Sequence, residues 1–216
     1  MPIHISGTGS FIPKNKVDNN SFCDKLFFDK DGNEYTTSND EIIEKFQTIT
    51  GIKERRYADK EHKTSDLATF AAQNAIKDAG IDKESIDYII VAHNFGDIEY
   101  GTNQYIALPS VATIVKHKLD ILNENCVAYD IIFGCPGWIE GVIQASAFIK
   151  SKMAKRCLVI GADTLSRTID ESDRDSMIFA DGAGATIVEE NLEPGGILSH
   201  KTITKAGKEA LYLFCE

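Results

Sequence analysis

The sequence predicts an α/β fold with a mainly parallel, mixed sheet. Short apolar runs typical of strands alternate along the chain with longer segments in which apolar residues recur at helical spacing. One run, residues 87–93, is apolar almost without interruption, as in strands that are buried on both faces of a parallel sheet. The 216 residues, 43% of them hydrophobic, can bury one large core or two small ones.

The first predicted elements are a strand and a short helix. Residues 3–12 form the strand, and Pro13 closes it. Asp18 or Asn20 then caps a short helix that ends near Leu26, because either side chain can accept a hydrogen bond from the first backbone N–H groups.

An insertion and two helices follow. Residues 27–35 indicate a turn or hairpin, because an Asp-Gly pair is a turn signal. Asn39 or Asp40 begins a helix that Gly51 ends. Thr64 or Ser65 caps the next helix, whose alanine-rich apolar stripe continues to residue 79, where Gly80 stops it.

The later elements continue the alternation. They are a helix from Pro109 to about Leu119, a strand over residues 127–133, a helix from Pro136 to about Met153, and strands over residues 157–162, 183–189 and 196–204. We expect the last two strands to form a hairpin or meander.

Cys135 is the strongest candidate for a functional residue. It follows the strand 127–133 and Gly134, and it directly precedes the proline that begins the next helix. A thiol at a helix start lies where the backbone N–H groups and the helix dipole favour its anion, which is the nucleophilic form. That helix is apolar around its whole circumference, so we expect it to be buried, with the thiol at the floor of a cavity.

Composition narrows the classes of partner and cofactor. The net charge of −10 argues against nucleic acid as the main partner. The chain has no long apolar run and no signal-peptide layout at its start, which favours a cytoplasmic protein without a membrane partner. Its five cysteines form no C-x-x-C pair, so we expect reduced thiols and no metal site.

Two small basic clusters are either solvated surface or a docking site for an acidic protein. One comprises Lys152, Lys155 and Arg156, and the other comprises Lys53, Arg55 and Arg56.

Two glycine-rich segments suggest no cofactor. Gly7-Thr-Gly9 lacks the third glycine of a dinucleotide loop, and Pro13 blocks the helix that such a loop requires. The segment 181–185, with glycines at positions 182 and 184, opens a strand instead of a helix, and these glycines indicate close backbone packing.

An ordered series of segments resembles the ketoacyl-ACP synthase III branch of the thiolase-like superfamily. The matching segments are residues 7–13, 50–56, 108–110, 130–137, 159–163, 173–174 and 179–185. The resemblance extends over essentially the whole chain. It implies a thiolase-like fold in which residues 1–216 form the N-terminal half of a duplicated α/β unit.

The resemblance also implies a chemistry. The cysteine of this family takes an acyl group from acyl-CoA or from acyl carrier protein (ACP). It then passes that group to malonyl-ACP in a decarboxylating Claisen condensation, in fatty acid or specialised lipid and polyketide synthesis. Cys135 matches this nucleophile, and Arg174 matches an arginine beside the bound CoA. Leu108 matches a usually aromatic position that crosses the interface of a homodimer and helps wall the partner's acyl pocket. No metal or cofactor is implied.

The sequence departs from the family pattern in three respects. The catalytic His and Asn of the family belong to its second half, and none of the five histidines lies in a matching motif. The tryptophan and arginine that sandwich the CoA adenine are replaced near Lys45 and Ile49, which favours a carrier protein as acyl donor. The insertion around residues 27–38 is longer than in the housekeeping enzymes.

Two readings of the function follow. The first is the acyl-accepting half of a condensing enzyme, in which the small side chain of Leu108 predicts tolerance of primers longer than acetyl. The alternative is a non-catalytic half-domain that acts as an assembly or chain-length partner.

Overall fold

A five-stranded sheet lies at the centre of the computed structural model, which describes residues 2–29, 31–102 and 104–212. In spatial order the strands are β1 (Ile3–Phe11), β9 (Asp181–Glu190), β8 (Arg156–Thr164), β4 (Tyr88–His93) and β7 (Val127–Ile132). β8, β4 and β7 pair in parallel, and β9 is antiparallel to both of its neighbours. Four of the five strands therefore point the same way, which confirms the predicted α/β class with a mainly parallel, mixed sheet.

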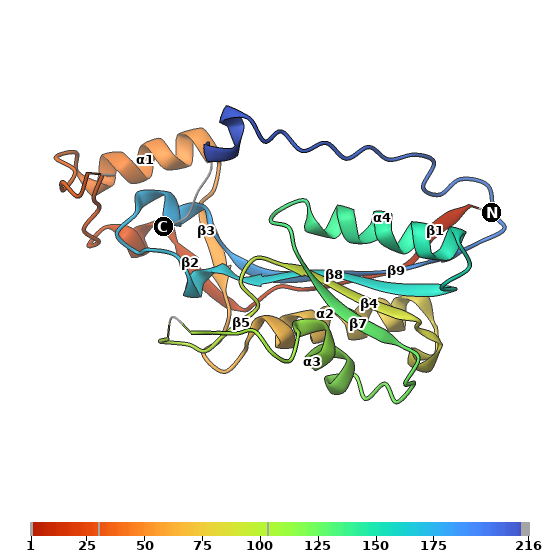
Figure 1. Ribbon diagram of the computed structural model, residues 1–216. Helices are drawn as coiled ribbons and strands as arrows, with labels where there is room; N and C mark the ends of the chain where they lie inside the picture. Colours follow the sequence, from red (N-terminus) through yellow and green to blue (C-terminus); the bar gives the residue numbers. More distant parts are fainter. Residues whose placement is uncertain (1, 30, 103, 213–216) are drawn as a thin grey trace.

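Helices cover both faces of this sheet (Figure 1). α2 (Thr64–Ala79) and α3 (Val111–Lys118) pack on one face, and α4 (Gly137–Lys150) packs on the other. The first interface contains a cluster of buried alanine, valine, leucine and isoleucine side chains, among them Ala71, Val91 and Leu158. The second contains Ile90, Val142 and Val159. Burial on both faces explains the continuous apolar run of β4.

The glycines of β1 allow α2 to approach very closely. A Cβ at Gly9 would lie 2.2 Å from the carbonyl oxygen of Ala71, and one at Gly7 would lie 2.6 Å from that of Ala75. The facing alanines of α2 are fully buried. Gly7-Thr-Gly9 therefore serves helix–strand packing, consistent with the expectation that it is not a dinucleotide loop.

A small lobe stands at one end of the sheet (Figure 1). It contains the antiparallel pair β2 (Asn15–Asp18) and β3 (Glu54–Tyr57), the 3₁₀ turn η1 (Asn19–Phe22) and helix α1 (Asn39–Thr50). Asp18 caps η1 as predicted, but the turn ends at Phe22, short of Leu26. α1 begins at Asn39 as predicted, with Ser38 as its N-cap, and Gly51 ends that helix in the left-handed conformation as predicted.

Several predicted boundaries need correction. Lys63 occupies the N-cap of α2, and α3 begins at Val111, two residues after Pro109, because Ser110 accepts the capping hydrogen bond. α4 begins at Gly137 and ends at Lys150, three residues before Met153. The sequence signals also missed β2, β3 and the two-residue strands β5 (Asp97–Ile98) and β6 (Tyr105–Ile106). Short 3₁₀ turns complete the chain: η2 (Lys83–Ser85), η3 (Leu165–Arg167), η4 (Arg174–Ile178) and η5 (Lys208–Leu211).

The predicted strand over residues 196–204 is wrong. This segment runs along the α4 side of the molecule, outside the sheet (Figure 1). Only its start contacts the sheet edge, where the Ile197 N–H donates to the Ile3 carbonyl at 2.8 Å. Ile197 packs against the α4 side of the core, but the later apolar side chains are exposed, Leu198 at 86% and Ile203 at 64%. This single backbone hydrogen bond to β1 is not continued into a ladder in the described chain, so the apolar pattern forms no strand.

Candidate active site

Cys135 lies in the turn between β7 and α4. Gly134 has a φ of 71°, a left-handed conformation that turns the chain away from the strand, and its carbonyl accepts the N–H of Gly137 at 2.9 Å. The thiol thus stands at the carboxyl end of a parallel strand and directly before a helix N-terminus. The expected strand–cysteine–helix arrangement is present.

The thiol is exposed, contrary to the expectation that it lies at the floor of a buried cavity. The reason lies in α4. One side of this helix packs on the sheet, but its other side has no covering layer in the described chain, and Ile139 is 56% exposed. The expectation that the whole helix is buried is therefore wrong for the described chain, in which only the side that faces the sheet is buried.

Cys135 lines an open pocket of about 300 Å³. The pocket forms where the carboxyl ends of β4 and β8 meet the start of β9. Its lining includes Ala92, Gly134, Trp138, Asp163, Gly182 and Gly184. A Cβ at Gly184 would meet no atom within 4 Å, so the expectation of close packing there is wrong. This glycine instead leaves space in the pocket wall.

A carboxylate faces the same pocket. Asp163 accepts the backbone N–H of Asn94 at 2.9 Å and the Asn94 side-chain amide at 2.7 Å. Burial raises the pKa of the Asp163 carboxyl, while both hydrogen bonds from Asn94 oppose the rise. The Asn94 amide oxygen also lies near Gly134, 3.8 Å from where a Cβ would stand. Asn94 therefore lies between the half-buried Asp163 carboxyl and the turn that carries Cys135.

Asp130 fixes the neighbouring end of β7. Its carboxylate accepts the N–H groups of Val111 and Ala112, both at 2.8 Å, at the start of α3, where a negative charge is favourable. The same carboxylate contacts the Nε2 atom of His93 at 3.0 Å, and His93 is 6% exposed. None of the five histidines is among the residues that line the Cys135 pocket.

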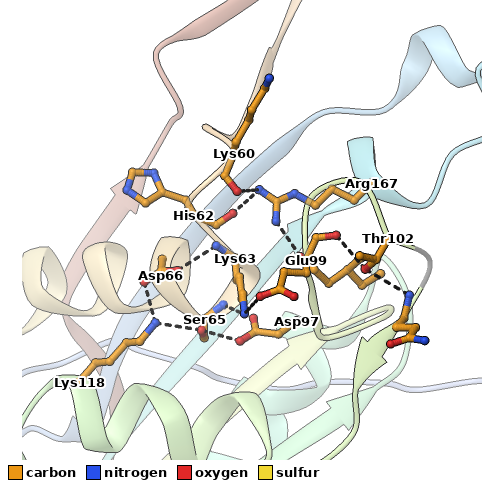
Figure 2. Close-up of polar contacts among 12 residues, drawn as sticks. Lys60, His62, Lys63, Ser65, Asp66, Asp97, Glu99, Thr102, Lys118 and Arg167 are labelled. Carbon is orange, nitrogen blue, oxygen red and sulfur yellow. Dashed lines mark hydrogen bonds and ion pairs between the residues drawn. The ribbon is translucent and has the colours of Figure 1, made fainter.

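Leu108 lies on the surface, 84% exposed, between β6 and α3. The β5–β6 segment before it is anchored by a polar network (Figure 2). Asp97 is 2% exposed and accepts both the N–H and the hydroxyl of Ser65 at 2.7 Å. Arg167 donates to the Ile98 carbonyl at 2.6 Å. The network holds the segment that presents Leu108, although Leu108 itself does not line the Cys135 pocket.

Arg174 begins η4 and lies outside the Cys135 pocket lining. Its side chain is 46% exposed, and its guanidinium carbon lies 4.7 Å from the centre of the Tyr35 ring. The structure therefore places only Cys135 of the three predicted site residues in this pocket.

The remaining cysteines differ from Cys135. Burial raises the pKa of the Cys126 thiol to about 11 and that of Cys157 to about 12. Cys23 is half-buried, and Cys215 lies outside the described residues.

The basic clusters are largely committed to internal contacts. Arg55 is 4% exposed and donates to Asn19 at 2.7 Å, so it cannot contribute to a surface patch. Arg156 pairs with Glu189 at 2.6 Å, and Lys152 pairs with Glu190 at 3.2 Å.

Known proteins are similar to this chain in sequence and in fold. Residues 129–206 match the family model described as 3-oxoacyl-[acyl-carrier-protein (ACP)] synthase III. Over 196 residues the chain is 42% identical to the beta-ketoacyl-[acyl-carrier-protein] synthase III of Neisseria meningitidis, an alignment that covers 90% of this chain and 54% of that protein. The crystal structure of 3-oxoacyl-[acyl-carrier-protein] synthase III from Aquifex aeolicus superposes with a TM-score of 0.73 and 35% identity, over 88% of this chain and 55% of the other. The corresponding Thermus thermophilus enzyme gives 0.72 and 32%, over 89% of this chain and 53% of the other.

The chain is similar in sequence and in fold to synthase III proteins. It spans about half the length of the curated relatives that it matches. The family match contains Cys135, Asp163 and Arg174 but not Leu108. The fold expected from the resemblance is confirmed, whereas the roles of Cys135, Arg174 and Leu108 stay predictions.

Sequence reasoning did not single out Asn94 or Asp163, although a signal was present. Both follow apolar strands that run parallel to the strand before Cys135. The carboxyl ends of parallel strands meet at one edge of a sheet, which is where ligands bind in open α/β sheets.

No cluster of three or more His, Cys, Asp or Glu side chains in the described ranges has the geometry of a metal site. No helix in the described part of the chain is long and apolar enough to span a membrane.

Proposed function

We propose that this chain is the acyl-accepting half of a beta-ketoacyl-ACP synthase III-type condensing enzyme that acts in the cytoplasm. The observation that carries the proposal is the exposed thiol of Cys135 in a pocket at the carboxyl edge of the sheet, within the matched family segment. No metal or cofactor is required by this chemistry.

The first step is a thioester exchange. The Sγ atom of Cys135 attacks the carbonyl carbon of an acyl-CoA or acyl-ACP, and the donor leaves as a free thiol that carries the proton lost by Cys135. Backbone N–H groups of the turn, including that of Cys135, help stabilise the oxyanion. Malonyl-ACP then loses CO₂, and the resulting carbanion attacks the carbonyl carbon of the acyl group. The new C–C bond forms as the thioester bond breaks, and Cys135 leaves as the thiolate.

Decarboxylation needs groups that we do not assign to residues 1–216. No histidine lines the Cys135 pocket. The family's catalytic His and Asn, expected from the resemblance, belong in this proposal to the other half of the thiolase-like unit. In this division of roles, residues 1–216 supply the nucleophile, Cys135.

In this proposal the protein forms a homodimer, and Leu108 lies at the interface between the two protomers. Its side chain is exposed beside α3, and two more exposed apolar side chains lie at the end of β7 and just after it, Ile132 at 76% and Phe133 at 43%. We infer that a second protomer covers these side chains and that Leu108 helps to wall its acyl pocket. The small leucine leaves room for primers longer than acetyl, so octanoyl donors should compete effectively with acetyl donors, and Leu108→Phe should shift the preference toward acetyl.

Acylation tests the proposal. The protein is incubated with octanoyl-ACP or octanoyl-CoA, and the intact mass is measured. One octanoyl adduct is expected, it should be absent from Cys135→Ser, and it should persist in the control Cys23→Ser. The absence of an adduct with every donor, in folded protein, would overturn the proposal.

The same exposed apolar side chains also favour a second candidate, a non-catalytic assembly or chain-length partner. It predicts a stable complex with a complementary subunit and a Cys135 thiol that is alkylated no faster than a free thiol.

A further inference from the structure

Two consecutive side chains tie the carboxyl end of β4 to the strands on either side. His93 contacts Asp130 of β7 at 3.0 Å, and the Asn94 amide donates to Asp163 of β8 at 2.7 Å. Asp163 lines the same pocket as Cys135. The second of these ties therefore lies next to the thiol.

The Asn94 side chain is fixed by its two hydrogen bonds to Asp163. One carboxyl oxygen accepts the backbone N–H of Asn94 at 2.9 Å, and the other accepts the side-chain amide. Both residues are half-buried. Because the amide nitrogen donates to the carboxyl, the orientation of the amide is set and its oxygen is left to face another neighbour. That neighbour is Gly134, in the turn that carries Cys135.

The turn needs support from outside because it is built on glycine. Gly134 has a φ of 71°, and glycine has the widest choice of backbone conformations, so contacts must hold it in this one. One contact is internal, between the Gly134 carbonyl and the Gly137 N–H at 2.9 Å. Beyond its chain neighbours, the Asn94 amide oxygen is the one described heavy atom within 4 Å of the point where a Gly134 Cβ would stand.

We propose that Asn94 is a positioning residue for acyl transfer to Cys135 and that Asp163 holds it in place. The pair keeps the turn in the conformation that presents the thiol and the backbone N–H groups together to one carbonyl group. An exposed but misaligned thiol still reacts with simple reagents, but it gains less stabilisation of the oxyanion. The inference rests on the proposed acyl transfer.

Comparing acylation with alkylation separates alignment from exposure. Acylation of Cys135 by octanoyl-ACP and its alkylation by iodoacetamide are measured as second-order rate constants between about pH 6 and pH 9.5, per mole of folded protein. Asn94→Ala should lower the limiting acylation rate at high pH about 10- to 100-fold, the cost of a misaligned reacting group. Alkylation forms no oxyanion, so its limiting rate should change no more than about three-fold. A limiting acylation rate within about two-fold of the wild type would overturn the inference.

Asn123→Ala is the matched control. Asn123 is half-buried, and its side-chain amide donates to the Glu84 carbonyl at 3.1 Å, near the opposite end of β7. This variant should lose stability and keep the wild-type limiting acylation rate. An equal loss of acylation in both alanine variants would show general destabilisation instead of positioning, and would overturn the inference.

An exchange of the two side chains tests the pairing directly. Asn94→Asp alone places two carboxyls together and should lower the limiting acylation rate. Adding Asp163→Asn lets the new amide at position 163 donate to the new carboxylate at position 94, while its oxygen accepts the backbone N–H. The double variant should recover to within about three-fold of the wild type, because the contact is restored with its direction reversed. No recovery would contradict the pairing.

Hydrogen exchange at the Gly137 amide tests the turn without an acyl donor. Asn94→Ala should speed this exchange at least about ten-fold more than the exchange of the β4 amides, because the turn opens locally. Asn123→Ala should not, and unchanged exchange in Asn94→Ala would overturn the inference. If no donor acylates wild-type Cys135, the proposed function fails, and this measurement still decides whether Asn94 supports the turn.

Discussion

Alkylation of the folded protein with iodoacetamide at pH 8 should strongly favour Cys135 over the buried thiols. The reagent reacts with thiolates, and an ordinary thiol with a pKa of about 8.5 is roughly one-quarter ionised at this pH. Burial raises the pKa of Cys126 to about 11 and that of Cys157 to about 12. Their thiolate fractions at pH 8 are therefore about 1 in 1,000 and about 1 in 10,000.

The net rate effect is smaller than this loss of thiolate. A more basic thiolate is a better nucleophile, with a Brønsted slope of about 0.45, which offsets part of the loss. The two effects leave Cys126 about 20-fold and Cys157 about 60-fold slower than an ordinary thiol. The Cys126 residue is 3% exposed and Cys157 is 0% exposed, so steric exclusion slows both further.

Peptide mapping by mass spectrometry after short labelling times gives the rate at each cysteine. Cys135 should be labelled first, and Cys126 and Cys157 should be labelled only when the chain is unfolded in urea, which serves as the control for intrinsic reactivity. Labelling of Cys126 or Cys157 as fast as Cys135 in the folded protein would refute the assignment of the exposed and buried thiols.

Further predictions concern packing and the pocket. Gly9→Ala should lower the free energy of unfolding in urea by about 1–3 kcal/mol, because its Cβ would meet the α2 backbone, whereas Gly184→Ala, with open space around it, should change stability by less than about 0.5 kcal/mol. A similar loss for both would contradict this packing. Asn94→Ala removes one hydrogen-bond donor from the half-buried Asp163 and should cost about 1–3 kcal/mol of stability and alter the alkylation rate of Cys135. Unchanged stability and an unchanged rate would count against this contact. Burial raises the pKa of Asp163, so its stabilising contribution is present at pH values below the ordinary aspartate pKa and is lost as the pH rises through the folded value. Denaturation at several pH values should therefore show the stability of Asp163→Asn rising relative to the wild type with pH, and a difference independent of pH would argue against the shift.

The alternation of strands and helices made the fold class predictable, because apolar spacing reports which side chains face the sheet. Gly51 and Gly80 also marked helix ends correctly, since a left-handed cap strongly favours glycine. The segment 196–204 misled because an apolar run has the same appearance whether or not a neighbouring strand is available to pair with it. Such pairing is a long-range property that local patterns do not contain.

A site residue was predictable only where a reactive side chain stands at a position that the local sequence pattern identifies, such as a strand end or a helix start. Cys135 stands at a strand end and a helix start, and both signals are local. Asp163 and Asn94 meet only because β4 and β8 are neighbours in the sheet. The contact between Tyr35 and Arg174 joins residues that are far apart in the chain, so no local sequence pattern predicts it.

The most direct test of the central claim is to locate the acyl group after incubation with octanoyl-ACP. Tandem mass spectrometry of the peptides should place one octanoyl group on Cys135, and neutral hydroxylamine should release it as expected for a thioester. An adduct on another residue, or none on Cys135 while the folded protein is alkylated there, would contradict the role of Cys135 as the acyl acceptor.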